Sequence, residues 1–211
     1  MDIQKVMENL RKNNFKVSYV ATKAEVVPLI DSLTEPGSSA AVGGSVTLSE
    51  TGVLEHLRSG KYRFFDRYAA GLTEEERAEV FRQSAFADYF FCSSNAITED
   101  GKLYNVDGNG NRIAALIYGP KQVIVVAGVN KIVPDLDAAV RRVKTVAAPK
   151  NAARLHCATY CANAGRCVKA DAPAGEGCDS PARICCDYLV SAQQRVKDRI
   201  HVILVGEDCG Y

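Results

Sequence analysis

The chain has 211 residues, of which 47% are hydrophobic and 24% are charged, and its formal net charge is +1. This length and composition fit one globular domain with a sizeable core and argue against a disordered chain. Basic and acidic residues are interspersed, so the charge pattern gives no reason to expect binding to nucleic acid or to an anionic membrane surface.

The expected compartment is the cytoplasm. The first residues, MDIQKVMENLRKNNFKV, are charged throughout and lack the apolar core of a secretory signal. The longest apolar runs, such as VIVVAGV from Val123, are too short to span a bilayer. In a reducing compartment, clustered cysteines serve as metal ligands or redox thiols more often than as disulfides.

Helix and strand patterns alternate along the chain. Apolar residues at helical spacing predict a helix over 3–10, and Thr22, Thr47 and Thr73, each followed by Glu three residues later, predict capped helix starts. A further helix is predicted over 134–146. Strands are predicted at 15–21, 38–42, 61–68, 88–94, 102–106, 121–128 and 199–207. The turn DGNGN lies between KLYNV and RIAALIYG, which predicts a β-hairpin. This order indicates an α/β fold with an antiparallel portion.

Three polar segments are candidates for a ligand site. A strand leads to Gly43 and Gly44 and then to a helix start, where backbone N–H groups can receive an anion, although the glycines could simply allow a tight turn. Asn, Asp and Gly crowd positions 95–111, as they do in ordinary turns, and the run does not match a calcium loop. Asn130 and Lys131 follow a buried strand, where open α/β sheets bind ligands.

Six of the eight cysteines fall within one segment of 30 residues: Cys157, Cys161, Cys167, Cys178, Cys185 and Cys186. Tetrahedral zinc or an iron–sulfur cubane needs four thiolates brought together. No C-x-x-C spacing is present, so the pattern fits neither a zinc ribbon nor a bacterial ferredoxin. Inert or redox-active thiols are the alternative.

Several long blocks resemble one family. GGSVTLSETGVLE, SSNAITEDGKLYNVDGNGNRIAAL, GPKQVIVVAGVNKIV, NAARL, SPARIC and RIHVILVGEDCGY are similar to the LUD-domain (lactate utilisation, YkgG-like) proteins. The resemblance runs from about Val6 to Tyr211. It implies a NagB/RpiA/CoA-transferase-like mixed sheet with flanking helices, in a single domain over 1–211 with a Cys-rich insertion at about 156–187.

The resemblance also implies two sites. The ligand site, for a small anion, comprises Gly43, Gly44, Ser45, Glu50, Asn95, Asp107, Gly108, Asn109, Asn111, Asn130 and Lys131. The metal site, for an iron–sulfur cluster or zinc, comprises Cys161, Cys167, Cys178 and Cys185. Here Tyr160 stands where the family usually has proline and the spacer before Cys178 is long, so Cys157 or Cys186 could compete as ligands. No nucleotide motif is present, and no catalytic residue is nominated.

The expected function is a component of bacterial lactate oxidation to pyruvate that works with iron–sulfur partner subunits. If the chain is an enzyme or enzyme subunit, its role is oxidoreductase-associated. The alternative is a non-catalytic subunit that holds structural zinc and docks iron–sulfur partner proteins.

Overall fold

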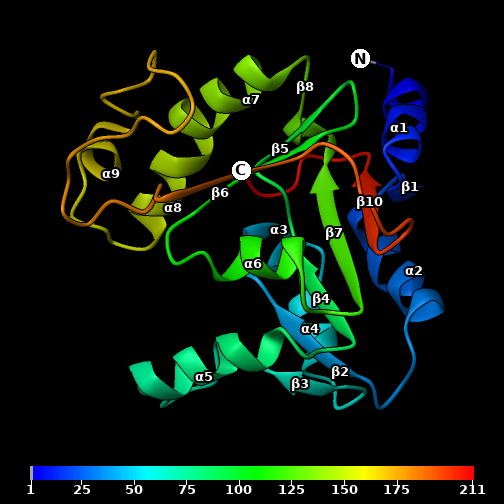
Figure 1. The fold of residues 1–211 in the computed structure, drawn as a ribbon. Coiled ribbons are helices and arrows are strands. Elements are labelled where there is room, and N and C mark those ends of the chain that lie inside the picture. The colour runs from blue at the N-terminus through cyan, green and yellow to red at the C-terminus, as the bar shows by residue number, and fades with distance from the viewer. Residues whose placement is uncertain (1) are drawn as a thin grey trace.

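The computed structural model describes residues 2–211, in which the strands form two sheets (Figure 1). The strands are β1 (Lys16–Val20), β2 (Ser39–Val42), β3 (Arg63–Phe65), β4 (Tyr89–Cys92), β5 (Ala96–Thr98), β6 (Leu103–Asp107), β7 (Gln122–Gly128), β8 (Ile132–Val133), β9 (Asp187–Ser191) and β10 (Ile200–Val205). The larger sheet is parallel throughout, in the order β1-β10-β7-β4-β2-β3. The smaller sheet has the order β8-β5-β6-β9, with β6 antiparallel to both neighbours.

Helices cover both faces of the larger sheet. They are α1 (Ile3–Lys12), α2 (Val26–Leu33), α3 (Val46–Glu50), α4 (Val53–Leu57), α5 (Glu74–Ser84), α6 (Asn111–Ile117), α7 (Leu136–Arg142), α8 (Ala148–Arg154) and α9 (Tyr160–Ala164), with short turns η1 (Lys23–Glu25) and η2 (Val129–Lys131) and a π-helical turn η3 (Val143–Ala147). The fold is therefore α/β, with a parallel-dominated sheet and flanking helices. Across the described residues, every helix falls short of the length and apolar character that a membrane span needs.

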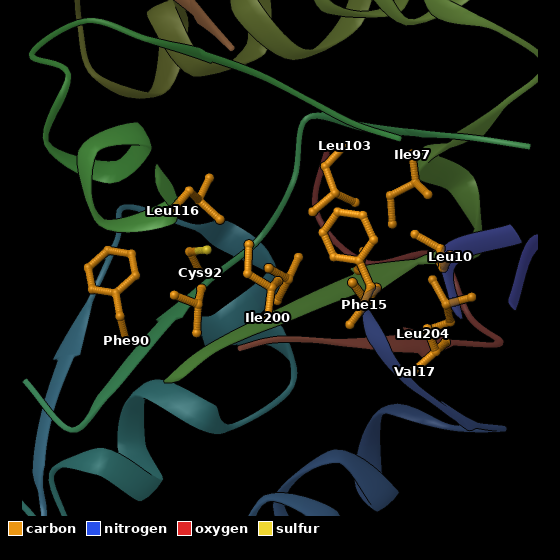
Figure 2. Packing of buried hydrophobic residues seen from close by; sticks show 14 of the residues in the cluster. Leu10, Phe15, Val17, Phe90, Cys92, Ile97, Leu103, Leu116, Ile200 and Leu204 are labelled. Carbon is orange, nitrogen blue, oxygen red and sulfur yellow. The ribbon is translucent and has the colours of Figure 1, made fainter. Parts of the chain in front are cut away.

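The buried hydrophobic residues form three clusters. On one face of the larger sheet, α2, α3 and α4 pack against β2, β4, β7 and β10. On the other face lie α1, α6 and the smaller sheet, and Figure 2 shows Leu103 and Leu116 from these elements over Phe90 and Ile200. The far side of the smaller sheet packs against α7, η3 and α8. The central strands β7 and β10 are buried on both faces, which explains their unbroken apolar sequences.

The predicted hairpin around DGNGN is wrong. The residues after it form α6, and its apolar side chains Ile113 and Leu116, three positions apart, are buried. Gly110 adopts a left-handed backbone, with φ of 72°, at the start of this helix. The antiparallel partners of β6 are β5 and β9, and β9 comes only after the cysteine segment. Because β9 is so distant in the sequence, no local pattern indicates that it pairs with β6. The turn residues by themselves therefore predicted a strand where α6 forms.

The predicted helix caps have different outcomes. The capping boxes of Thr22 with Glu25 and of Thr73 with Glu76 are both confirmed. The third is wrong, because Ser45 caps α3 through a bond from the Leu48 N–H. The hydroxyl of Thr47 donates instead to the Cys209 carbonyl at 3.1 Å.

Candidate functional site

A cavity of about 220 Å³ lies where the parallel strands of the larger sheet end. Its wall combines the segments that follow β2, β3, β4 and β7 with the end of β6, part of α8 and Tyr211. The carboxyl edge of an open α/β sheet is where such folds bind their ligands. Topology therefore makes this cavity the candidate functional site.

Most of the predicted ligand residues meet at this cavity. Those that line it are Gly44, Ser45, Asn95, Asp107, Gly108, Asn109, Asn111 and Lys131. They come from three segments that are far apart in the sequence. The structure thus brings the glycine turn, the Asn/Asp-rich segment and the residues after β7 to one place.

Three predicted ligand residues lie outside the cavity wall and have other contacts. The Gly43 N–H donates to a carbonyl of β4 at 2.8 Å, and a Cβ at this position would lie 3.1 Å from Cγ of Arg112. Glycine therefore allows close packing here and offers no donor to a ligand. Glu50 and Asn130 both hold Gly210, through its N–H at 2.9 Å and its carbonyl at 3.1 Å.

Positive charge dominates the cavity wall. Its cationic side chains are Arg67, Arg112, Lys131 and Arg154. Among the described residues of the wall, the acidic side chain is Asp107, which is already bound. Its two oxygens accept from the N–H groups of Gly108 at 2.8 Å and Arg112 at 2.9 Å, and from that of Ile113 at 3.2 Å. The wall is therefore suited to an anion.

Arg67 is held by aromatic rings. Its guanidinium carbon lies 4.5 Å from the centroid of the Phe81 ring and 5.5 Å from that of Tyr68. Burial lowers the pKa of Arg67. It forms no ion pair with any acidic residue that the structure describes. A guanidinium that is stacked and has no acidic partner can bind a carboxylate through two parallel hydrogen bonds.

Arg112 holds other residues of the cavity wall in place, because its terminal nitrogens already donate hydrogen bonds to oxygens of the protein. It is only 9% exposed, and its terminal nitrogens donate to four oxygens: the carbonyls of Ser93 (3.2 Å) and Val106 (2.7 Å) and the side chains of Asn95 (2.9 Å) and Asn105 (2.5 Å). These bonds tie the end of β6 to the segment after β4. The arginine thereby orients Asn95 at the cavity.

Lys131 lies deep in the wall. It is 3% exposed, and its Nζ lies 2.8 Å from Oγ1 of Thr47 and 2.9 Å from Oγ of Ser93. Burial, assisted by the charges of Arg142 and Arg112, lowers the pKa of Lys131 to about 7. A lysine in this state titrates near neutral pH.

Tyr211 and α8 together form one side of the cavity. Arg154 donates from Nε to the hydroxyl of Tyr211 at 2.8 Å and from Nη2 to Oδ1 of Asn151 at 2.7 Å. The Tyr211 hydroxyl itself donates to Asn151 at 3.1 Å. Two segments that are 57 residues apart are joined in this way.

The wall residues that sequence reasoning missed include Arg67, Tyr68, Arg112, Arg154 and Tyr211. Arg67 and Tyr68 could have been found, because they are the last two residues of the strand predicted over 61–68 and so belong at its carboxyl end, although the observed β3 already ends at Phe65. Arg112 was assigned to the hairpin that proved wrong. The other two come from segments whose approach is set only by tertiary packing.

Four of the clustered cysteines line a second cavity, of about 30 Å³: Cys161, Cys167, Cys178 and Cys185. Cys157 and the exposed Cys186 do not line it. Burial, with smaller effects of the neighbouring thiols, raises the pKa of Cys185 to about 12. In residues 2–211, no group of three or more His, Cys, Asp or Glu side chains is arranged closely enough to hold a metal ion. The four thiols share a cavity wall without forming a ligand sphere.

Two cationic side chains, one buried and one partly buried, hold the cysteine segment in place. Lys144, in the π-helical turn η3, is 5% exposed and donates to the carbonyls of Lys169 and Pro173, both at 3.0 Å, and to that of Ala172. Arg183 donates to the carbonyls of Cys185 at 2.7 Å and Cys178 at 3.3 Å. These bonds fix the backbone that carries the cysteines.

The cysteine segment also borders the larger cavity. Ile184 lines both cavities, and its backbone lies against Gly108. The N–H of Cys186 donates to the Asp107 carbonyl at 2.9 Å. The two candidate sites are therefore neighbours, and the yellow-to-orange cysteine segment of Figure 1 lies beside β6.

The LUD domain family matches residues 3–205, so the chain belongs to this family and the resemblance found in the sequence is confirmed. Membership suggests a role related to lactate utilisation. Among solved structures, a DUF162 family protein from Deinococcus radiodurans is 15% identical with a TM-score of 0.49, and the match covers 97% of this chain and 96% of that chain.

Two further solved structures are similar to part of the chain. The eIF2B delta protein of Chaetomium thermophilum is 18% identical with a TM-score of 0.35, over 62% of this chain and 52% of that chain. The eIF2B beta protein of the same organism is 16% identical with a TM-score of 0.36, and the match covers 63% of this chain and 47% of that chain. The comparison with curated proteins gives no match.

Proposed function

We propose that this chain is a lactate-utilisation protein that binds a small carboxylate, of the size of lactate or pyruvate, in the cavity at the carboxyl edge of the larger sheet. The observation that supports this most is the charge of the wall. Three arginines, Arg67, Arg112 and Arg154, and the amine of Lys131 line it, while Asp107 is occupied by backbone N–H groups. An anion would supply the missing negative charge.

The size of the cavity supports a small ligand. Its volume of about 220 Å³ is below the ~300–1,000 Å³ typical of pockets for drug-sized molecules. Arg67, stacked and without an acidic partner, is suited to the ligand's carboxylate. The amine of Lys131 and the hydroxyl of Ser93 offer polar contacts to a hydroxyl or carbonyl oxygen on the neighbouring carbon.

Calorimetric titration of the full chain with L-lactate and with pyruvate tests this proposal. The Arg67→Met variant keeps the packing of the alkyl chain but removes the guanidinium. A hydrogen bond to a charged group contributes about 1.5–3 kcal/mol, so the affinity for either ligand should fall by roughly 10-fold or more. Arg82→Met is the matched control, since Arg82 is exposed and pairs with Glu79 on α5.

A steric variant probes the same cavity. A Cβ added at Gly44 would lie 3.5 Å from the Tyr68 hydroxyl and 3.7 Å from Nη1 of Arg67, which are ordinary contact distances. Gly44→Ala should therefore weaken lactate and pyruvate binding without lowering the melting temperature. The proposal is wrong if neither carboxylate binds, or if Arg67→Met and Gly44→Ala bind both as tightly as the unmodified chain.

We also propose that Cys161, Cys167, Cys178 and Cys185, which line one cavity but form no ligand sphere in this structure, turn toward one another to hold a single thiolate-ligated metal ion. Four soft sulfur donors suit zinc. The cavity of about 30 Å³ has room for one or two water-sized groups, which favours one ion over an iron–sulfur cubane. Such an ion would stabilise the irregular segment between α8 and β9, as structural zinc does elsewhere.

Metal and sulfide analysis of anaerobically purified protein tests the metal proposal. We expect a colourless protein with one zinc per chain and no inorganic sulfide. Cys185→Ser should lose most of the metal, whereas Cys186→Ser, at an exposed neighbour outside the cavity, should keep it. A brown protein that contains sulfide would contradict the single ion, and a metal-free protein would contradict the site.

A further inference from the structure

Lys131 is a buried primary amine at the cavity wall that lacks an acidic partner. It is 3% exposed, lines the cavity and forms no ion pair within the part of the chain that the structure describes. Buried ammonium groups are normally paired with a carboxylate. This arrangement needs an explanation beyond fold stability.

The hydrogen-bond partners of Lys131 suit a neutral amine as well as an ammonium. Both are hydroxyls, of Thr47 at 2.8 Å and Ser93 at 2.9 Å, and a hydroxyl can donate or accept. The Thr47 hydroxyl donates to the Cys209 carbonyl at 3.1 Å. The Ser93 hydroxyl has only a long contact of 3.4 Å to the Ser94 carbonyl, so it can turn and donate to the nitrogen lone pair.

Lys144 provides an internal contrast. It is as deeply buried, at 5% exposed, but its Nζ faces three backbone carbonyls of the cysteine segment. Carbonyl oxygens can only accept, so this site needs the N–H donors of the amine and offers nothing to its lone pair. Lys144 therefore serves as a matched control for a buried lysine with a structural role.

The charges that face Lys131 come from four elements. Arg112 of α6 and Arg142 of α7 disfavour the ammonium, whereas Glu50 of α3 and Cys209 after β10 favour it more weakly. Burial has the largest effect, and together they lower the pKa of Lys131 to about 7. Desolvation beside other cations is one of the ways in which proteins activate a lysine as a nucleophile.

We propose, building on the carboxylate-binding function above, that Lys131 Nζ condenses with the carbonyl carbon of a 2-oxo acid bound in this cavity. The amine lone pair forms the C–N bond while the carbonyl π electrons move to oxygen, which takes up a proton to give a carbinolamine. The carbinolamine hydroxyl then leaves as water with the proton lost from nitrogen, and an imine remains. The step is reversible and needs no oxidant or reductant.

The two kinds of basic group in the cavity wall, guanidinium and amine, indicate the class of ligand. A guanidinium, Arg67 or Arg154, pairs with the carboxylate, and the amine of Lys131 meets the adjacent keto carbon. A 2-hydroxy acid has no carbonyl carbon beside its carboxylate. It would therefore occupy the same cavity without forming the covalent bond.

Borohydride trapping tests the inference. The full chain is equilibrated with pyruvate at a series of pH values, quenched with sodium borohydride and analysed by intact mass and peptide mapping. We expect one reduced pyruvyl adduct, on Lys131, with a yield that rises as the pH passes through about 7. Excess L-lactate should suppress it in the unmodified protein. Lys131→Arg should abolish the adduct, while Lys144→Arg should retain it.

The outcomes separate this inference from the proposed function. Pyruvate that binds by calorimetry without forming an adduct on Lys131 overturns the inference and leaves the carboxylate site standing. An adduct that persists in Lys131→Arg, or that lactate does not suppress, also overturns it. If neither binding nor trapping occurs, both proposals are wrong. The lactate competition uses the unmodified chain, so the result does not depend on whether a variant folds.

Discussion

Replacement of Arg112 by Met tests whether this arginine organises the cavity wall. Methionine retains apolar volume but removes four hydrogen bonds, to two backbone carbonyls and to the side chains of Asn95 and Asn105. A buried acceptor that loses its partner costs more than the ~1 kcal/mol net value of a typical bond. We therefore expect a destabilisation of about 4 kcal/mol, which is a large share of the ~5–15 kcal/mol stability of a typical domain.

Urea denaturation followed by circular dichroism measures this effect. The midpoint should fall while the slope stays unchanged, because the same surface is exposed on unfolding. Arg82→Met, at an exposed arginine with one ion pair, should change the stability by less than ~0.5 kcal/mol. A loss below ~1 kcal/mol for Arg112→Met would refute the reasoning, since the four bonds could then not be holding the ends of β4 and β6.

Two further predictions concern stability. The pKa of Lys131 is about 7 when folded and 10.5 as its ordinary value, so the unfolded chain binds more protons between these pH values. As the pH rises from 7 to 10, the stability of the unmodified chain should therefore increase by roughly 3 kcal/mol relative to Lys131→Met, and equal changes in the urea midpoint of the two proteins would contradict this. Gly101→Ala should destabilise by more than ~2 kcal/mol, because φ is +85° and the new Cβ would lie 2.6 Å from backbone atoms of Asn9. Gly165→Ala, with φ of +71° and open space, should cost only about 1 kcal/mol; equal thermal shifts would rule out the clash.

The alternation of helices and strands could be read from local pattern. The unbroken apolar sequences of β7 and β10 predict strands buried on both faces, and capping boxes at Thr22 and Thr73 mark where helical structure begins. The position of Lys131, directly after such a strand, was enough to nominate it. In parallel sheets the carboxyl ends of strands lie on one edge, which makes such positions informative.

Local pattern failed where the structure depends on a distant partner. The segment after Asp107 has turn residues that suit a hairpin, but β6 pairs with β9, about eighty positions along the chain. With that partner in place, the residues from Asn111 onward are free to form α6 and to bury Leu116 against the sheet. Long-range pairing therefore overrides the preference of the turn.

Contiguous residues encode the family, the alternation of helices and strands, and a short list of polar residues at strand ends, so each of these could be read from local pattern. Tertiary packing sets which cations share the cavity, and it places Arg67, Arg154 and Tyr211 in the same cavity wall as Lys131. It also separated four cysteines that line one cavity from Cys186, which does not. The reason is that strand order and helix packing set these neighbours, and neither is written in the spacing of residues along the chain.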